Sequence, residues 1–229
     1  MFLAGFRSDM TGTKATRLDR FCATRGQAYL RFDYQGHGES TTAFEHCTIG
    51  LWLDDALAAL DQASEGGQIL VGSSMGAWIA LLAALRRPNR VAGLVCIAPA
   101  VDFTETLLWP RLGAAGQQRL LEDGALTIPS AYDPQGYVIT RRLIDEGREH
   151  LLLPGPIALP VPVRLLHGMA DADVPWQFSR RLAAALAGGD VVLTLIKDGD
   201  HRLSRHQDLV RLEAAIDELS QLARPEAGR

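Results

Sequence analysis

The segment from Gln68 to Trp78, QILVGSSMGAW, constrains the fold of this chain more than any other. An apolar run typical of a strand enters a G-x-S-x-G pentad, and an alanine- and leucine-rich run typical of a helix leaves it. A serine at the apex of such a turn stands clear of the backbone, and glycines two positions away on either side avoid collisions. Only Ser74 has glycine at both positions, so it is the candidate nucleophile rather than Ser73. The alternative is an ordinary helix start with a serine N-cap.

Short apolar runs alternate with amphipathic runs along most of the 229 residues. This alternation predicts an α/β fold, in which a mostly parallel twisted sheet carries helices on both faces. We expect strands at 1–4, 28–32, 68–71, 91–97, 163–167 and 191–196. We expect helices at 13–24, 49–63, 75–85, 178–186 and 209–222.

The alternation breaks down between residues 100 and 162, which include a helical pattern around 137–150 and a proline-rich return. We therefore expect a core of residues 1–99 and 163–229, with 100–162 as an inserted helical lid over the sheet edge. An ordinary helical excursion is the alternative. The candidates to line an acyl pocket are Leu107, Leu108, Trp109 and Trp176, for which ordinary packing on the core is the other explanation.

The net charge of −4 gives the chain no attraction to nucleic acid or to an anionic membrane surface. No run of about 18 apolar residues is present, so we expect no membrane span. The three cysteines are scattered, which favours free thiols in a reducing compartment. Because the N-terminus also lacks the layout of a signal peptide, we expect a cytoplasmic location. The oligomeric state is left open.

A serine nucleophile needs a base, and the base needs an acid to orient it. Asp171 follows one expected strand and His201 follows the last one, which places both at the carboxyl edge of the sheet. The order serine, aspartate, histidine is the order in which this architecture carries its catalytic residues. Asp173 is a competitor for the acid, and His206 is a competitor for the base.

Negative charge on a reacting carbonyl oxygen needs hydrogen-bond donors. One candidate is the backbone N–H of Met75, directly after the serine, and the other is the N–H of Phe6 in the loop after the first strand. Gly5 lets this loop turn. In the alternative, Arg7 or Ser8 supplies the second contact.

A second glycine turn, Asp33–Ser40, follows the expected strand at 28–32. Its G-x-G spacing occurs in phosphate-binding loops, but the third glycine is missing and no helix starts directly after it. We interpret it as a structural turn at the sheet edge. The chain also lacks a Walker loop, an HExxH motif and a His/Cys cluster with metal spacing, so we predict neither a cofactor nor a metal.

Taken together, these motifs resemble the α/β-hydrolase family over nearly the whole chain. The motifs are the elbow Gly72–Gly76, the acid loop His167–Pro175, the pair Asp200-His201 and the turn Asp33–Ser40. Within the family, the chain is similar to a branch described as palmitoyl-protein thioesterases and acyl-glucuronide esterases. The resemblance implies an esterase or thioesterase, and it assigns the family's catalytic roles to Ser74, Asp171 and His201.

Members of this fold carry a hairpin and most of a strand before the loop that holds Gly5, whereas this sequence begins almost at that loop. We therefore expect that the true start lies upstream of Met1. The alternative is a sheet that lacks its first strands.

The expected activity is that of a serine hydrolase, which cleaves acyl esters or thioesters through an acyl-enzyme. The acyl group would be carried by a small molecule or by a protein. An amidase or peptidase with the same triad and a non-catalytic ligand-binding protein are the alternatives. A dehalogenase is disfavoured, because it would require aspartate in place of Ser74.

Overall fold

Five parallel strands form the central sheet of the computed structural model, which describes residues 1–130 and 133–223. Each strand pairs in parallel with its neighbours, in the spatial order β1, β2, β3, β6, β7. Their bounds are β1 (Phe2–Leu3), β2 (Gln68–Ser73), β3 (Val91–Ile97), β6 (Val163–Gly168) and β7 (Val191–Ile196). The carboxyl ends of all five strands therefore meet at one edge of the sheet, where open α/β sheets place their sites.

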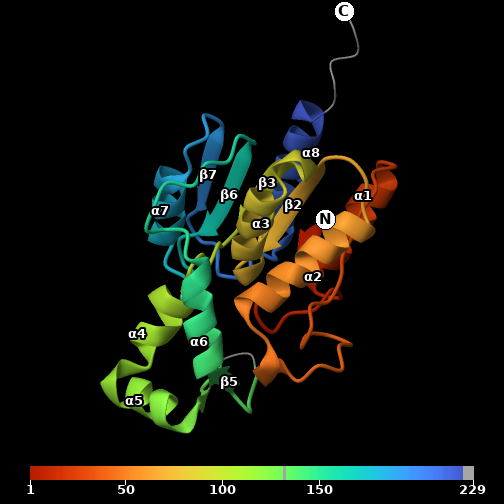
Figure 1. Ribbon diagram of the computed structural model, residues 1–229. Coiled ribbons are helices and arrows are strands. Elements are labelled where there is room, and N and C mark those ends of the chain that lie inside the picture. Colours follow the sequence, from red (N-terminus) through yellow and green to blue (C-terminus); the bar gives the residue numbers. More distant parts are fainter. Residues whose placement is uncertain (131–132, 224–229) are drawn as a thin grey trace, which may run out of the picture.

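Helices cover both faces of this sheet (Figure 1). Helix α3 (Met75–Arg86) connects β2 to β3, and α7 (Gln177–Ala185) connects β6 to β7, so right-handed crossovers place them on the same face. Helix α2 (Ile49–Gln62) packs against α3. On the opposite face α8 (His206–Leu222) packs against β2 and β3, beside α1 (Thr13–Thr24). This arrangement confirms the predicted α/β architecture.

Among the described helices, α3 is the most deeply buried. Ten successive residues of α3, from Met75 to Ala84, are buried, and its sequence is apolar on every side. A helix of this kind is enclosed on all sides, here by the sheet, by α2 and by the segment after β3. The turn that connects β2 to α3 is consequently held at both ends by the core.

The chain between β3 and β6 forms a small subassembly of its own at the sheet edge (Figure 1). It contains a π-helical turn (Thr104–Leu108), α4 (Trp109–Arg111), α5 (Gly113–Asp123), the antiparallel strands β4 (Ala125–Ile128) and β5 (Tyr137–Thr140), α6 (Arg141–Gly147) and a 3-10 turn (Arg148–His150). The assignment of residues 100–162 as a lid stays a prediction.

Hydrogen bonds close this segment on itself and fasten it to the core. The buried carboxylate of Asp102 joins the two ends of the segment, because it accepts the backbone N–H of Leu152 at 2.9 Å and that of Leu153 at 2.8 Å. The indole N–H of Trp78 on α3 donates to the carbonyl of His150 at 3.1 Å. The carboxylate of Glu146 on α6 accepts the N–H of Gly50, in the first turn of α2, at 2.8 Å. The segment thus packs as part of one body with the sheet.

Two predicted elements are wrong. The run 28–32 is not a strand, because β1 is two residues long and offers it a single bridge, Phe2 to Arg31. The pattern at 137–150 is not helical throughout, since β5 takes its first four residues and pairs with β4. Within the described residues, no helix is long and apolar enough to cross a membrane.

Candidate active site

Ser74 occupies a strained turn between β2 and α3. Its φ of 55° and ψ of −117° lie where residues with a side chain are rarely found. A Cβ on Gly72 would lie 2.5 Å from Cα of Ala77, and a Cβ on Gly76 would lie 2.5 Å from the carbonyl oxygen of Ala4. Glycine is therefore required at both positions, as the sequence predicted, because the turn is pressed against α3 on one side and the chain after β1 on the other.

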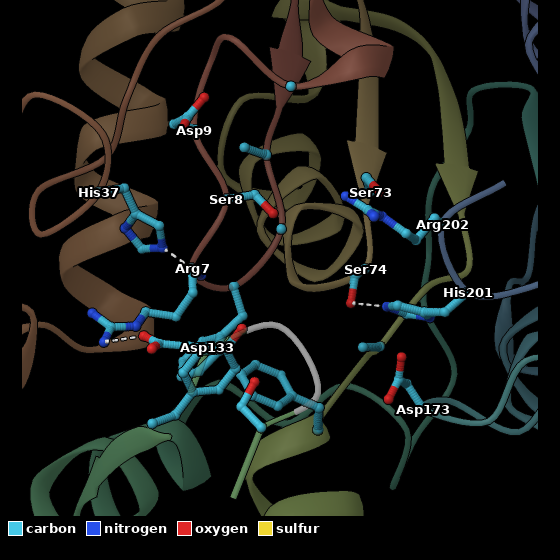
Figure 2. Close-up of a pocket in the computed structure, with 18 of the residues that line it drawn as sticks. Arg7, Ser8, Asp9, His37, Ser73, Ser74, Asp133, Asp173, His201 and Arg202 are labelled. Carbon is cyan, nitrogen blue, oxygen red and sulfur yellow. Dashed lines mark hydrogen bonds and ion pairs between the residues drawn. The ribbon is translucent and has the colours of Figure 1, made fainter. Parts of the chain in front are cut away.

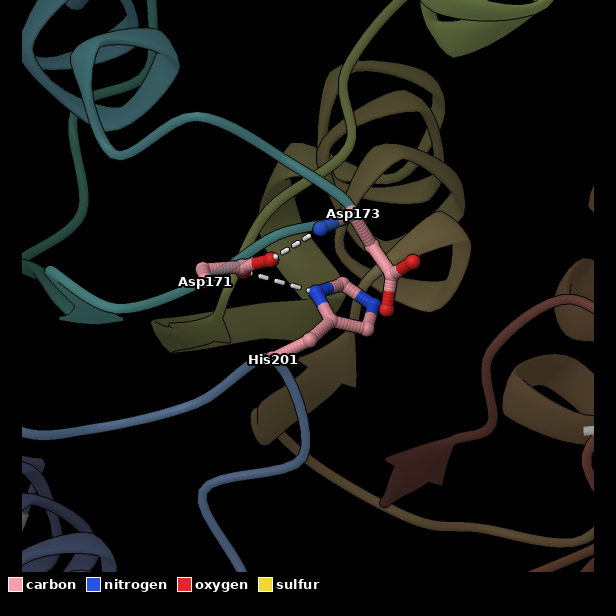
Figure 3. Close-up of side chains that lie close together, drawn as sticks. All are labelled: Asp171, Asp173 and His201. Atoms are coloured by element: carbon pink, nitrogen blue, oxygen red, sulfur yellow. Dashed lines mark hydrogen bonds and ion pairs between the residues drawn. The ribbon is translucent and has the colours of Figure 1, made fainter. Parts of the chain in front are cut away.

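The ring of His201 lies between Ser74 and Asp171. Its Nε2 atom is 3.2 Å from Oγ of Ser74, and its Nδ1 atom is 2.7 Å from Oδ2 of Asp171 (Figures 2 and 3). A carboxylate only accepts hydrogen bonds, so Nδ1 carries the proton and Nε2 is free to accept from the serine hydroxyl. The structure brings these three residues together, and their catalytic roles stay a prediction. The competitor His206 lies on the surface as the first residue of α8.

The carboxylate of Asp171 accepts four hydrogen bonds. Oδ1 receives the backbone N–H groups of Asp173 and Val174, each at 2.8 Å, and Oδ2 receives His201 together with Nε2 of His167 at 3.1 Å. Burial is the largest influence and opposes ionisation, but the bonds from the two histidines and from Val174 outweigh it and hold the pKa of Asp171 well below its usual range. Asp171 is therefore a fixed anion.

His167 contacts Asp171 in a way that the sequence analysis missed. Its side chain is fully buried, and its Nε2 also lies 3.0 Å from the carbonyl oxygen of Val174. Both partners of Nε2 only accept, so Nε2 carries the proton and Nδ1 accepts from the hydroxyl of Ser179 at 2.6 Å. In the sequence, the only signal for this contact is a spacing of four residues from Asp171.

Ligand atoms of Asp171, Asp173 and His201 lie within 4.8 Å of one another, the spacing of a metal site (Figure 3). The hydrogen bonds to Asp171 already use both of its oxygens, and an ion would have to displace them. The cluster fits an acid paired with a base better than a set of metal ligands. That no metal is used stays a prediction.

The loop after β1 lies directly against the serine turn. A Cβ on Gly5 would lie 3.4 Å from Cβ of Ser74. The N–H of Ser8 donates to the carbonyl of Gly5 at 3.0 Å, which closes a tight turn with Phe6 at its centre. Phe6 therefore follows Gly5, which lies against Ser74, and Met75 directly follows Ser74 in the chain. Their donation to an oxyanion stays a prediction.

A pocket of about 870 Å³ opens over Ser74 (Figure 2). Its apolar lining includes Leu107 and Leu108 of the predicted set. Among the described lining residues, neither Trp109 nor Trp176 is present. Instead, the guanidinium of Arg148 lies 5.0 Å from the centre of the Trp109 ring, and Trp176 occupies the position before the first residue of α7.

The other side of the pocket is polar and charged. Lys14 of α1 lines it, and its Nζ donates to the carbonyl of Arg202, the residue after His201, at 2.5 Å. Burial and the positive charge of Arg202 lower the pKa of Lys14 to about 8. Neither cation stands out in the sequence, because Lys14 lies in a surface helix and Arg202 lies in a loop.

Comparison with known proteins identifies the family. The model of the family "Serine aminopeptidase, S33" matches residues 11–146. Mouse palmitoyl-protein thioesterase ABHD10 is 43% identical over 220 residues, which cover 96% of this chain and 74% of the mouse protein. This chain belongs to the α/β-hydrolase family. A solved putative hydrolase from Agrobacterium vitis superposes on this α/β hydrolase with a TM-score of 0.92 and 47% identity, over 95% of this chain and 86% of that one. Mouse ABHD10 superposes with a TM-score of 0.89 and 42% identity, over 96% and 88%.

Membership of this family confirms two expectations and overturns a third. The α/β hydrolase fold and an enzymatic, hydrolytic activity are both confirmed. The expected cytoplasmic location is wrong, because the ABHD10 relatives from mouse, cattle and human are named as mitochondrial proteins. That expectation depended only on features that the sequence lacks.

Proposed function

We propose that this α/β hydrolase cleaves carboxylic esters or thioesters of acyl groups by covalent catalysis at Ser74. The observation that carries the proposal is the position of the His201 ring, 3.2 Å from Oγ of Ser74 and 2.7 Å from Oδ2 of Asp171. A serine hydroxyl is a weak nucleophile until a base accepts its proton, and this geometry provides that base together with the anion that orients it.

In the first half of the reaction, Nε2 of His201 takes the proton of Ser74 while Oγ attacks the acyl carbon. The carbonyl oxygen becomes an oxyanion, for which the N–H groups of Phe6 and Met75 are the candidate donors. Asp171 stabilises the charged ring. Nε2 then gives its proton to the leaving oxygen or sulfur, and the acyl group stays on Ser74. Water repeats the cycle and releases the acid.

The pocket supports an acyl substrate, carried by a small molecule or by a protein. Leu107, Leu108 and Phe103 line it on the side of the segment 100–162, which we propose acts as a lid on a core of residues 1–99 and 163–229. The palmitoyl-protein thioesterase name of the mouse relative favours a thioester. The second candidate is hydrolysis of an amide or peptide bond, which the description of the matching family favours.

A labelling experiment tests the nucleophile. A fluorophosphonate probe should label the parent protein and the S73A variant, which differs from S74A by one position, and it should not label S74A. We expect S74A to lose on the order of 10⁴-fold or more in turnover of a p-nitrophenyl ester. Labelling of S74A at the parent rate would overturn the proposal.

Competition against the same probe separates the candidate reactions. Acyl thioesters and p-nitrophenyl esters of graded chain length should compete and be hydrolysed, whereas aminoacyl p-nitroanilides should not. Turnover of the anilides alone would favour the peptidase. Tight binding of acyl ligands with no turnover would favour a non-catalytic receptor.

A further inference from the structure

The glycine turn Asp33–Ser40, interpreted above as structural, is bound to the loop that carries Phe6. His37 is buried, and its Nε2 accepts the backbone N–H of Arg7 at 3.1 Å (Figure 2). At the other end of the same turn, Oδ1 of Asp33 accepts the N–H of Met10 at 2.7 Å. Two side chains of one turn thus hold the loop at two points.

The partners of His37 fix its chemical form. Nδ1 lies 3.2 Å from the carbonyl oxygen of Gln35, which only accepts, so Nδ1 carries the proton. Nε2 faces the N–H of Arg7, which only donates, so Nε2 is unprotonated. Burial is the largest influence and lowers the pKa of His37, and the charge of Arg7 acts in the same direction. The hydrogen bond to Gln35 and the charges of Asp33 and Asp55 oppose this shift without reversing it. The ring is therefore a neutral acceptor.

The loop needs this support. Arg7 has a φ of 60°, which is unfavourable for a residue with a side chain. The hydrogen bond to His37 fixes the peptide plane between Phe6 and Arg7. His37 itself is enclosed by aromatic rings, with the centroids of Phe44 at 5.3 Å and Trp52 at 5.2 Å. A rigid part of the core thus determines how the loop faces Ser74.

We propose that His37 is a positioning residue, which holds the loop at Gly5–Ser8 so that the N–H of Phe6 faces the reacting carbonyl oxygen. The inference depends on the function proposed above, because it assigns His37 a role only in that reaction. His37 lines the pocket, but both of its ring nitrogens bind backbone groups, so in this proposal it acts through Phe6.

Two substitutions of one residue test this role. In H37Q the side-chain amide reaches the place of Nε2 and can accept from Arg7, whereas in H37N the shorter amide reaches only the place of Nδ1. We measure kcat and KM for p-nitrophenyl butyrate, with kcat expressed per active site titrated with a fluorophosphonate, so that unfolded protein does not count. The control is H46N, because His46 is an exposed histidine in the chain that follows the turn Asp33–Ser40.

We expect H37N to lose about 10- to 100-fold in kcat per site with KM changed less than about threefold, because a small misplacement of a catalytic group costs up to about that much. H37Q should recover most of the loss, and H46N should match the parent. The inference is overturned if H37N keeps kcat per site within about threefold of the parent, or if H37Q is as impaired as H37N. Survival of activity in S74A would instead overturn the proposed function, so the two failures are distinguishable.

Discussion

Nε2 of His167 lies 3.1 Å from Oδ2 of Asp171, the same oxygen that receives His201 at 2.7 Å. The buried ring of His167 thus holds the carboxylate of Asp171, and the same carboxylate orients the ring of His201. Since both partners of Nε2 only accept, Nε2 carries the proton and Nδ1 accepts from Ser179, which gives the ring one tautomer and one orientation. The acid of the candidate triad is fixed before any substrate binds.

Replacing His167 by phenylalanine keeps a ring in place and removes both nitrogens. The hydroxyl of Ser179 loses its partner and Asp171 loses one donor, so we expect a loss of about 1–3 kcal/mol in the free energy of unfolding. We expect kcat to fall about tenfold, because Asp171 loses one of the four hydrogen bonds that fix its direction. S179A, which removes only the bond to Nδ1, should lower kcat less. Equal kcat values for H167F and S179A would contradict a role for His167 in holding Asp171.

The low pKa of Asp171 makes the stability of the protein depend on pH. Its carboxylate is favoured in the folded state, so its contribution is fully present above the pKa of an unfolded aspartate, about 3.9, and is lost as the pH falls toward the lower folded value. Urea unfolding of the parent and of D171N at pH 7, 5 and 3.5 measures this contribution. The difference in stability should be smaller at pH 3.5 than at pH 5, because only the lower pH lies below the pKa of an unfolded aspartate. A difference that does not change with pH would show that the charge of Asp171 contributes nothing.

Gly76 cannot be replaced by alanine without moving β1. The added Cβ would lie 2.5 Å from the carbonyl oxygen of Ala4 and closer still to that of Leu3, and neither backbone atom can move aside. We expect G76A to lose about 3 kcal/mol in the free energy of unfolding, by urea titration. G155A is the control, because a Cβ on Gly155 would have no neighbour within 4 Å, and its change should stay within about 0.5 kcal/mol. Equal stability of the two variants would contradict the close packing of the turn.

Lys14 should titrate near pH 8, well below the value of about 10.4 for a free lysine. The chain has one other lysine, Lys197, which is exposed, so selective ¹³C labelling of lysine gives two side-chain signals. The R202Q substitution removes a nearby positive charge and should raise the pKa of Lys14. If the Lys14 signal titrates above pH 10 in the parent, the side chain is not desolvated as the structure indicates.

Local patterns were enough to predict the elements that hold the site. The apolar run into the elbow, the glycines that flank Ser74 and the apolar helix after it each follow from short-range sterics or burial. The elements at 91–97 and 191–196 match the structure residue for residue. The strand at 191–196 is paired along its whole length, and the strand at 91–97 is paired at every residue except Ala92, where the register with β2 shifts.

What the sequence could not indicate depends on partners far along the chain. Residues 137–140 form a strand because 125–128 lie beside them, and Thr140 then caps α6 through the N–H of Leu143. The contact of His37 with Arg7 spans 30 positions, so its glycine turn alone carries no sign of it. The contact of Trp109 with Arg148 is likewise between distant positions, because the guanidinium of Arg148 lies over the Trp109 ring at 5.0 Å.

Ser74 and His201 are separated by 127 positions. A ribosome must therefore release the whole of β7 before the hydroxyl can meet its base. Under the proposed mechanism, the nascent chain cannot attack acyl groups until β7 and the turn that carries His201 have left the ribosome.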